Sequence, residues 1–228
     1  MKSIKIFMLC AGLLLKHTLA LAGPGVNSID KAQEIISRGQ ATAIKNTAQG
    51  SEQPAVIEFF SFYCPPCYAF SNHYGIDKEI SKILPPGQKL AKYHVDFLGP
   101  LGAHLTDAWV IAQVMGIEDK VEPLLFEAAQ VTHTLKTPED IKKIFEKVGI
   151  TTERYNHMLK SILVRGKVAE QRSLFNKYQI TGTPTIIVNG QYRMNNGGFS
   201  GNSIDKFRRE YISSVAILLK SDEGKGNF

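Results

Sequence analysis

Two cysteines separated by two prolines, Cys64-Pro65-Pro66-Cys67, constrain this 228-residue chain more than any other feature of its sequence. The third cysteine, Cys10, lies far away near the N-terminus. A disulfide between Cys64 and Cys67 closes a very short loop, and the loop-entropy model gives such a bridge only about 2 kcal/mol of stabilisation. The pair therefore suits a bond that opens and closes better than it suits a structural link.

The residues around the cysteine pair predict a strand that leads directly into a helix. Residues 55–60 form a short apolar run rich in strand-forming side chains, and Pro65 suits the first position of a helix, where its missing N–H costs nothing. Unpaired N–H groups and a partial positive charge at the helix start favour a thiolate on Cys64, the more exposed cysteine. Cys67, one turn further in and more buried, is the candidate resolving thiol.

Two other uses of a close cysteine pair stay open at this point. A zinc site needs two further ligands, and the chain offers neither a second cysteine pair nor a spaced histidine pair. A purely structural disulfide contributes little to a domain of this size. Thiol–disulfide exchange is therefore the favoured interpretation, and we expect no metal and no cofactor.

The first 22 residues have the layout of a secretory signal. Two lysines give a basic start, residues 6–15 form an apolar run too short to span a bilayer, and Ala20-Leu21-Ala22 offers small residues to a signal peptidase. We expect cleavage after Ala22, with an uncleaved amphipathic anchor as the alternative. Cleavage removes Cys10, three lysines and no acid, so the formal net charge falls from +6 to +3. That charge is too small to predict binding to nucleic acid.

The remaining chain carries two strand-bearing blocks separated by one long helical stretch. This order predicts an α/β fold in which a helical domain, residues 99–178, interrupts a discontinuous domain of residues 23–98 and 179–228. Residues 23–50 are polar and mixed and predict no element, and residues 221–228 look like a frayed tail. We expect strands at 55–60, 89–97, 185–188 and 191–194, and helices at 65–84 with a kink near Gly75, 103–115, 119–130, 138–148, 152–163, 167–178 and 204–219.

Glu58 is the one charged residue inside the first apolar strand, six residues before Cys64. Burial of a carboxylate is costly and tends to raise its pKa. One explanation is a proton relay for the buried thiol of Cys67, and a glutamate on a less buried strand face is the alternative. Lys92, on the next expected strand, is a possible charge partner.

Pro184 opens the late hairpin, directly after Thr183. X–Pro bonds are the peptide bonds that are commonly cis. A cis bond here would expose backbone groups to an extended substrate peptide, whereas a trans turn proline is the alternative. His94 stands alone on the second expected strand, and a lone histidine of this kind is more often structural than catalytic.

Five stretches of the chain carry a resemblance to a known family. They are FFSFYCPPCYAF (59–70), KYHVDF (92–97), LTDAW (105–109), GIEDKVEPLLFEAAQ (116–130) and TGTPTIIVNGQY (181–192). Together they resemble the DsbA family of bacterial periplasmic protein-disulfide oxidases. The resemblance runs from about Ala55 to Tyr211 and includes a helical insertion that ordinary thioredoxins lack. It implies a thioredoxin-like fold with an inserted all-helical domain.

The resemblance implies a role for each matching residue. Cys64 matches the nucleophilic cysteine and Cys67 the resolving cysteine. Pro184 matches the cis-proline, Glu58 the buried acid and Lys92 the buried lysine. The residues expected to contact the substrate are Thr183, Pro65 and Pro66. The implied reaction passes a disulfide to unfolded exported proteins, after which a membrane quinone reductase of the DsbB type reoxidises the enzyme. We expect a soluble periplasmic monomer that docks on a membrane protein only transiently. A reductase or isomerase, or a folding helper or binding module with incidental thiols, is the alternative.

The dipeptide between the cysteines departs from the family pattern. The usual pair is Pro-His, and here it is Pro65-Pro66. A histidine there can add positive charge beside Cys64, whereas Pro66 carries neither charge nor N–H. We therefore expect an oxidase weaker than a member with Pro-His and stronger than a thioredoxin.

Overall fold

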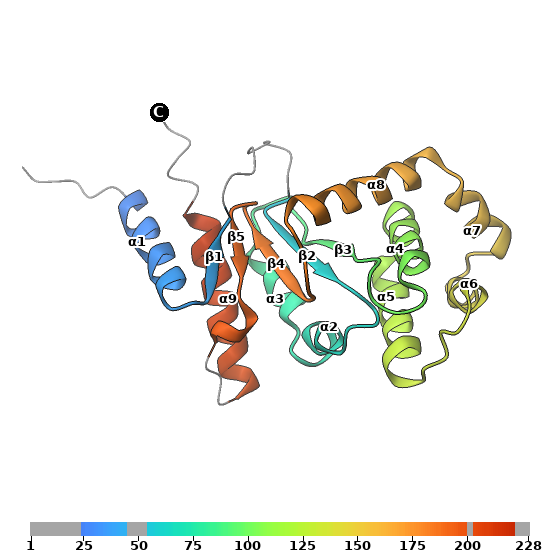
Figure 1. The fold of residues 1–228 in the computed structure, drawn as a ribbon, viewed down its shortest axis with the longest axis horizontal. Helices are drawn as coiled ribbons and strands as arrows, with labels where there is room; N and C mark the ends of the chain where they lie inside the picture. Colours follow the sequence, from blue (N-terminus) through green and yellow to red (C-terminus); the bar gives the residue numbers. More distant parts are fainter. Residues whose placement is uncertain (1–23, 45–53, 200–202, 222–228) are drawn as a thin grey trace, which may run out of the picture.

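The computed structural model describes residues 24–44, 54–199 and 203–221, and these build a mixed β-sheet with helices packed around it (Figure 1). Within the described residues the strand order is β1-β5-β4-β2-β3. β2 pairs in parallel with β3, and the other neighbours pair antiparallel. The strands are β1 (Ala41–Ala43), β2 (Val56–Phe60), β3 (Ala91–His94), β4 (Thr185–Val188) and β5 (Tyr192–Met194).

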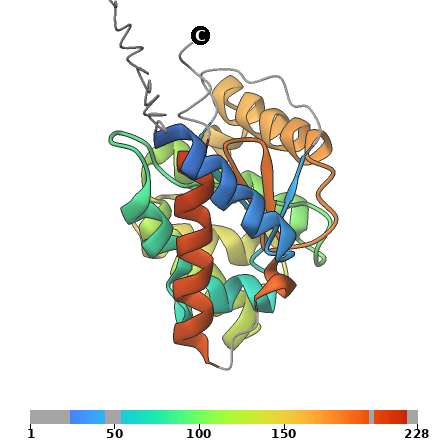
Figure 2. The same ribbon diagram turned by 90° about the vertical axis from the view of Figure 1, so that its left-hand side faces the viewer.

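Apart from α2 and α3, the helices fall into two groups in space. Figure 1 shows α4 to α8 gathered beyond β3, whereas α1 and α9 lie at the opposite end, and Figure 2 shows α1 and α9 side by side in front of the sheet. The helices are α1 (Pro24–Ser37), α2 (Pro65–Tyr68), α3 (Ile76–Ile83), α4 (Gly102–Met115), α5 (Glu118–Phe126), α6 (Pro138–Lys147), α7 (Thr152–Leu159), α8 (Ile162–Lys177) and α9 (Ile204–Lys220), with π-helical turns η1 (Ala69–His73) and η2 (Glu127–Val131) and a 3₁₀ turn η3 (Asn196–Gly198).

Strand β2 is buried along its whole length, which explains why its sequence is almost continuously apolar. Successive side chains point to opposite faces of the sheet. Ile57 and Phe59 pack with Tyr178 on one face. Val56 packs on the other face with residues of α1, α3 and α9, and Glu58 has the same parity as Val56. Glu58 is completely buried, so the sequence-based alternative of a less buried strand face is wrong.

The expected elements after residue 54 are present, but several of their boundaries were wrong. The expected helix 65–84 is broken into α2, η1 and α3, with Gly75 in the left-handed region (φ +63°) where the kink was predicted. The expected strand 89–97 is shorter, as β3. The expected break between 163 and 167 lies instead at 160–161, because the Ser161 side chain accepts a hydrogen bond from the Val164 N–H and begins α8 there.

Residues 23–50 hold structure that the sequence did not predict, namely α1 and β1. The expected signal segment, residues 1–22, and most of the expected tail, residues 222–228, lie outside the described residues. Among the helices that are described, none is both long enough and apolar enough to cross a membrane.

Candidate active site

The cysteine pair forms a disulfide at the start of α2, with the two Cα atoms 5.2 Å apart. Cys64 is the N-cap residue, and its Sγ accepts a hydrogen bond from the Cys67 N–H at 3.1 Å. Cys64 is 4% exposed and Cys67 0% exposed. The sequence predicted that Cys64 is the more exposed of the two cysteines, although Cys64 is more buried than expected. The cap geometry means that the helix start already points a donor at the sulfur that should become a thiolate.

The two prolines limit how many donors the first helical turn can offer. Pro65 and Pro66 occupy the first two helical positions, and neither has an N–H. The Tyr68 N–H bonds to the Cys64 carbonyl at 3.1 Å. The amide of Cys67 is therefore the donor that this turn directs at Cys64 Sγ.

The segment before β4 lies beside Cys64, because β4 runs antiparallel to β2 with Phe59 opposite Thr185. That register brings the start of β4 to the end of β2 that leads to the cysteines. The Thr183–Pro184 bond is cis, as the family resemblance implied, so the alternative of a trans turn proline is wrong. The Thr183 carbonyl oxygen is 3.4 Å from Cys64 Sγ. Residues 119 positions apart in the chain therefore meet at the reactive sulfur.

The loop between β2 and Cys64 is held from two sides. The Phe62 N–H donates to Nε2 of His94 at 3.2 Å, and Gln130 Nε2, from η2, donates to the Phe62 carbonyl at 2.7 Å. His94 Nδ1 lies 2.9 Å from Thr106 Oγ1. Burial lowers the pKa of His94 to about 3, with a small opposing effect from Asp96. His94 is thus a neutral residue with a structural role, as the sequence suggested.

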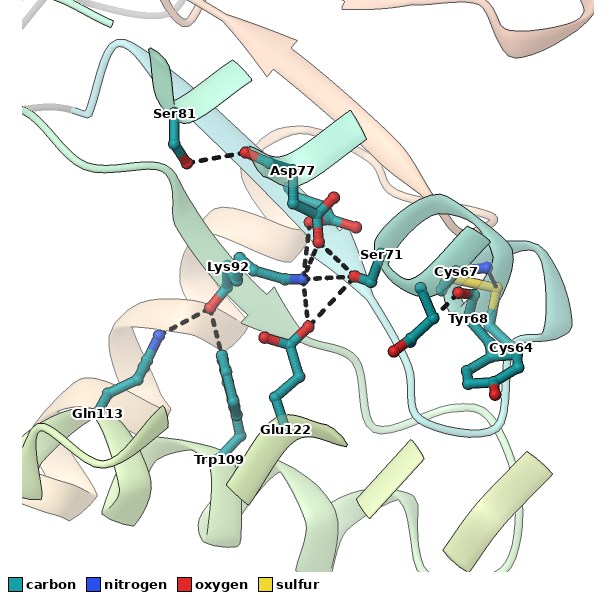
Figure 3. Close-up of polar contacts among 12 residues, drawn as sticks. Cys64, Cys67, Tyr68, Ser71, Asp77, Ser81, Lys92, Trp109, Gln113 and Glu122 are labelled. Carbon is teal, nitrogen blue, oxygen red and sulfur yellow. Dashed lines mark hydrogen bonds and ion pairs between the residues drawn. A yellow bond between two sulfur atoms is a disulfide. The ribbon is translucent and has the colours of Figure 1, made fainter. Parts of the chain in front are cut away.

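Lys92 lies at the centre of a buried cluster of polar and charged side chains (Figure 3). We name this group the lysine cluster; its members are Glu58, Ser71, Asp77, Lys92 and Glu122. The parallel register pairs Glu58 with Lys92 across β2 and β3. Lys92 Nζ lies 3.3 Å from Glu58 Oε2, 2.6 Å from Glu122 Oε1 and 3.0 Å from Ser71 Oγ, and it also contacts Asp77 Oδ2. The Ser71 hydroxyl contacts Asp77 Oδ2 and lies 3.2 Å from Glu122 Oε1.

The lysine cluster shifts the pKa values of its two innermost members in the same direction. Burial raises the pKa of Glu58 to about 8, and repulsion from Asp77 and Glu122 adds to it while Lys92 opposes it. For Lys92, burial alone would lower the pKa, but the attraction of Glu58, Asp77 and Glu122 outweighs burial and raises it. Lys92 is therefore charged at neutral pH, and Glu58 keeps its proton to a higher pH than an ordinary glutamate does.

Ser71, Asp77 and Glu122 were not identified by the sequence reasoning. Ser71 follows Cys67 by one helical turn, and that spacing was a usable signal. Asp77 lies in the first turn of α3, where acidic residues are common because they interact favourably with the helix dipole, so it did not indicate a site. Glu122 lies on α5, far along the chain, and no local pattern connects it with Lys92. In Figure 3 Ser71 projects from the segment that follows Cys67 toward Lys92.

Comparison with known proteins gives one consistent result. Residues 55–211 match the family model described as the DSBA-like thioredoxin domain. The chain is 45% identical over 167 residues to the thiol:disulfide interchange protein DsbA of Yersinia pestis, which covers 73% of this chain and 81% of that protein. It is 40% identical over 204 residues to the protein of the same name from Salmonella typhimurium, covering 90% and 98%.

Solved structures agree with the sequence comparisons. SrgA of Salmonella enterica serovar Typhimurium superposes with a TM-score of 0.75 at 43% identity, covering 78% of this chain and 98% of that one. A Proteus mirabilis DsbA variant, solved with the non-covalently bound peptide PWATCDS, gives a TM-score of 0.74 at 38% identity, covering 79% and 95%.

Proposed function

Because the chain belongs to the DsbA-like thioredoxin-domain family of thiol:disulfide oxidoreductases, we propose that it oxidises pairs of thiols in newly exported proteins. A substrate thiolate attacks Cys64 Sγ, the Cys64–Cys67 bond breaks, and Cys67 leaves as a thiolate that takes up a proton. A second thiolate of the substrate then attacks the substrate sulfur of this mixed disulfide and expels Cys64 as a thiolate. The substrate loses two electrons and gains a disulfide, and the enzyme is left with two reduced cysteines.

The observation that carries this proposal is the surroundings of Cys64 Sγ. The sulfur lies 3.1 Å from the Cys67 amide nitrogen, and the Thr183 carbonyl stands on another side at 3.4 Å. The amide stabilises negative charge on Cys64 when it leaves. Cys67 is completely buried and gains its proton inside the protein.

Glu58 is our candidate for the proton donor to Cys67. The raised pKa of Glu58 supports this role, since a general acid must hold a proton at the working pH. Lys92 supports Glu58 by fixing its position through the 3.3 Å contact.

We propose that the substrate is an extended peptide that lies along Thr183 and beside Pro65 and Pro66. Thr183 comes before Thr185, the first residue of β4 that pairs with β2, so its backbone is placed outside that ladder. The peptide PWATCDS bound to the Proteus mirabilis relative supports this kind of ligand. Pro184 fixes the path of the segment that carries Thr183.

The setting of the reaction follows from the same proposal. The mature protein begins near Gly23, acts as a monomer in the periplasm, and passes its electrons to a membrane quinone reductase of the DsbB type. Residues 99–178 act as an inserted helical domain between the two parts, 23–98 and 179–228, of the thioredoxin-like domain.

Single cysteine variants test the assignment of roles. We expect Cys64→Ser to lose all oxidation of a reduced two-cysteine peptide. Cys67→Ser keeps the nucleophile and should accumulate a stable mixed disulfide with a single-cysteine peptide supplied as its glutathione disulfide. Non-reducing mass spectrometry measures both products. A Cys64→Ser protein that traps the peptide better than Cys67→Ser would reverse the roles of the two cysteines.

A further inference from the structure

The lysine cluster joins segments that are far apart in the sequence. Glu58 comes from β2, Lys92 from β3, Asp77 from α3, and Ser71 from the π-helical turn after Cys67. Glu122 comes from α5, within the helical stretch between β3 and β4. The cluster is therefore also a polar contact between that stretch and the part of the molecule that carries the cysteines.

The charges of the lysine cluster do not balance when every group is ionised. Three carboxylates face one ammonium group, and burying the excess negative charge is costly. Retention of one proton lowers this cost. Glu58 is the member best placed to hold it, because its side chain is 0% exposed and its contact in the cluster is the 3.3 Å approach of Lys92 Nζ to Oε2.

The other two carboxylates lie at the edge of the cluster. The side chain of Asp77 is 13% exposed and that of Glu122 is 19% exposed. Both contact Lys92 Nζ and the Ser71 hydroxyl. Asp77 and Glu122 therefore connect the cluster with its partly exposed edge, and Lys92 Nζ connects both of them with Glu58.

We propose that Glu122 is a positioning residue of the redox reaction, through which the helical stretch keeps the proton on Glu58 and exchanges it with solvent. The proposal rests on the proposed function, because the proton on Glu58 is the one that Cys67 takes when the disulfide opens. It gives the helical stretch a part in the chemistry in addition to any part in substrate binding.

The other groups that face the lysine cluster do not suit this role. The charges of Glu58 and Asp77 also act on Tyr211 of α9. Its phenol is completely buried, and burial together with these charges raises its pKa well above 10. The Tyr211 hydroxyl donates to Asn196 Oδ1 at 3.0 Å. Phe60 contributes only its ring face, 4.9 Å from Lys92 Nζ. Trp109 and Gln113 of α4 donate to the Lys92 carbonyl and not to the carboxylates.

The test compares Glu122→Gln with Glu127→Gln in the oxidised protein. Glutamine at 122 can still accept from Lys92 and Ser71, so the fold should survive while the charge is lost. Glu127 is exposed and lies five residues further on, so its variant loses the same charge outside the cluster. Carbon-13 NMR of the carboxyl groups follows the titration of Glu58, which is assigned from Glu58→Gln.

We expect Glu122→Gln to move the Glu58 midpoint down by about one pH unit, since one repelling charge is gone. Glu127→Gln should leave it in place, and Glu122→Asp, which keeps the charge, should stay close to wild type. The rate of mixed-disulfide formation should show the same shift in its pH profile. Equal midpoints in the Glu122→Gln and Glu127→Gln proteins, or an equal shift in Glu122→Asp and Glu122→Gln, would overturn the proposal.

The NMR titration needs no substrate, which separates the two possible failures. An unshifted midpoint with normal oxidase activity contradicts the role of Glu122 alone. A shifted Glu58 midpoint in a protein that does not oxidise thiols contradicts the proposed function. The effect of Glu122 on the proton of Glu58 would still be supported in that case.

Discussion

Among single residues, Pro66 limits how well the start of α2 can stabilise a thiolate, because it has no N–H to direct at Cys64 Sγ. An ordinary first turn offers several free amides, whereas here Pro65 and Pro66 remove two of them and the Cys67 N–H remains as the donor to Cys64 Sγ. Each pKa unit by which the Cys64 thiolate is stabilised contributes ~1.4 kcal/mol to the reduced form. For a two-electron couple that energy is about 30 mV.

Pro66→His should therefore lower the pKa of Cys64 and make the protein more oxidising by tens of millivolts. The substitution restores an amide and adds a ring that can carry positive charge beside the sulfur. A thiolate absorbance titration, together with equilibration against glutathione, measures both quantities in wild type and variant. A variant that is no more oxidising than wild type would mean that another residue beside Cys64, such as Thr183, sets the redox potential.

For individual residues, the sequence predicted the cysteines and Pro184 well, but it predicted only part of the lysine cluster. The cysteine pair was readable because it is a local motif, whereas the local sequence left the bond before Pro184 open and only the family resemblance implied that it is cis. Glu58 was noticeable because it interrupts an apolar strand. Asp77 and Glu122 were not noticeable, because their partner Lys92 lies 15 and 30 residues away along the chain and only the fold brings them together.

Among the elements, α8 illustrates how a single side chain sets a helix boundary. The expected helices 152–163 and 167–178 left a gap that contains Gly166, but α8 continues through this glycine from Ile162 to Lys177. The hydroxyl of Ser161 accepts the Val164 N–H at 3.1 Å and replaces a bond that the helix itself cannot supply. The cap overrides the local preference of glycine.

Ser161→Ala should lower the free energy of unfolding by about 1 kcal/mol, because the Val164 amide loses its acceptor. Ser173→Ala provides the matched control, since Ser173 is exposed in the middle of the same helix and alanine is the better helix former there. Urea unfolding followed by circular dichroism measures both. A Ser161→Ala protein as stable as Ser173→Ala would show that the cap contributes nothing.

Elements that depend on distant partners were the ones that the sequence did not predict. β1 has only three residues, and it is a strand because Ala41 to Ala43 pair with Tyr192 to Met194 of β5. α1 packs on α9, almost at the other end of the chain. By contrast, β2 was predicted within one residue, because a strand buried on both faces is recognisable from its own composition.

For the whole molecule, two buried groups set opposite slopes of stability against pH. The pKa of Glu58 rises from 4.5 to about 8 on folding, so its contribution to stability is complete below pH 4.5 and is lost as the pH rises to 8. The pKa of His94 falls from 6.5 to about 3, so stability is lost as the pH falls from 6.5 toward 3. Between pH 4.5 and 6.5 the two slopes oppose each other and nearly cancel.

The free energy of unfolding of the oxidised protein should therefore be highest and nearly flat between about pH 4.5 and 6.5, and should decline on both sides. Glu58→Gln should remove the decline between pH 6.5 and 8, because glutamine does not titrate. Urea unfolding at one-unit pH intervals measures the curves. An unchanged alkaline slope in Glu58→Gln would mean that Glu58 is ionised in the native protein at neutral pH.

The meeting of Thr183 with Cys64 also has a consequence for the order of events during folding. Both cysteines follow β2 directly, but β4, the strand that lies between β2 and β5, comes much later in the chain. A chain whose β4 has not yet joined the sheet has both thiols but no Thr183 carbonyl beside them. The site around Cys64 is therefore complete only once β4 is in place, and until then the protein is itself an unfolded thiol-bearing polypeptide of the kind that it is proposed to oxidise.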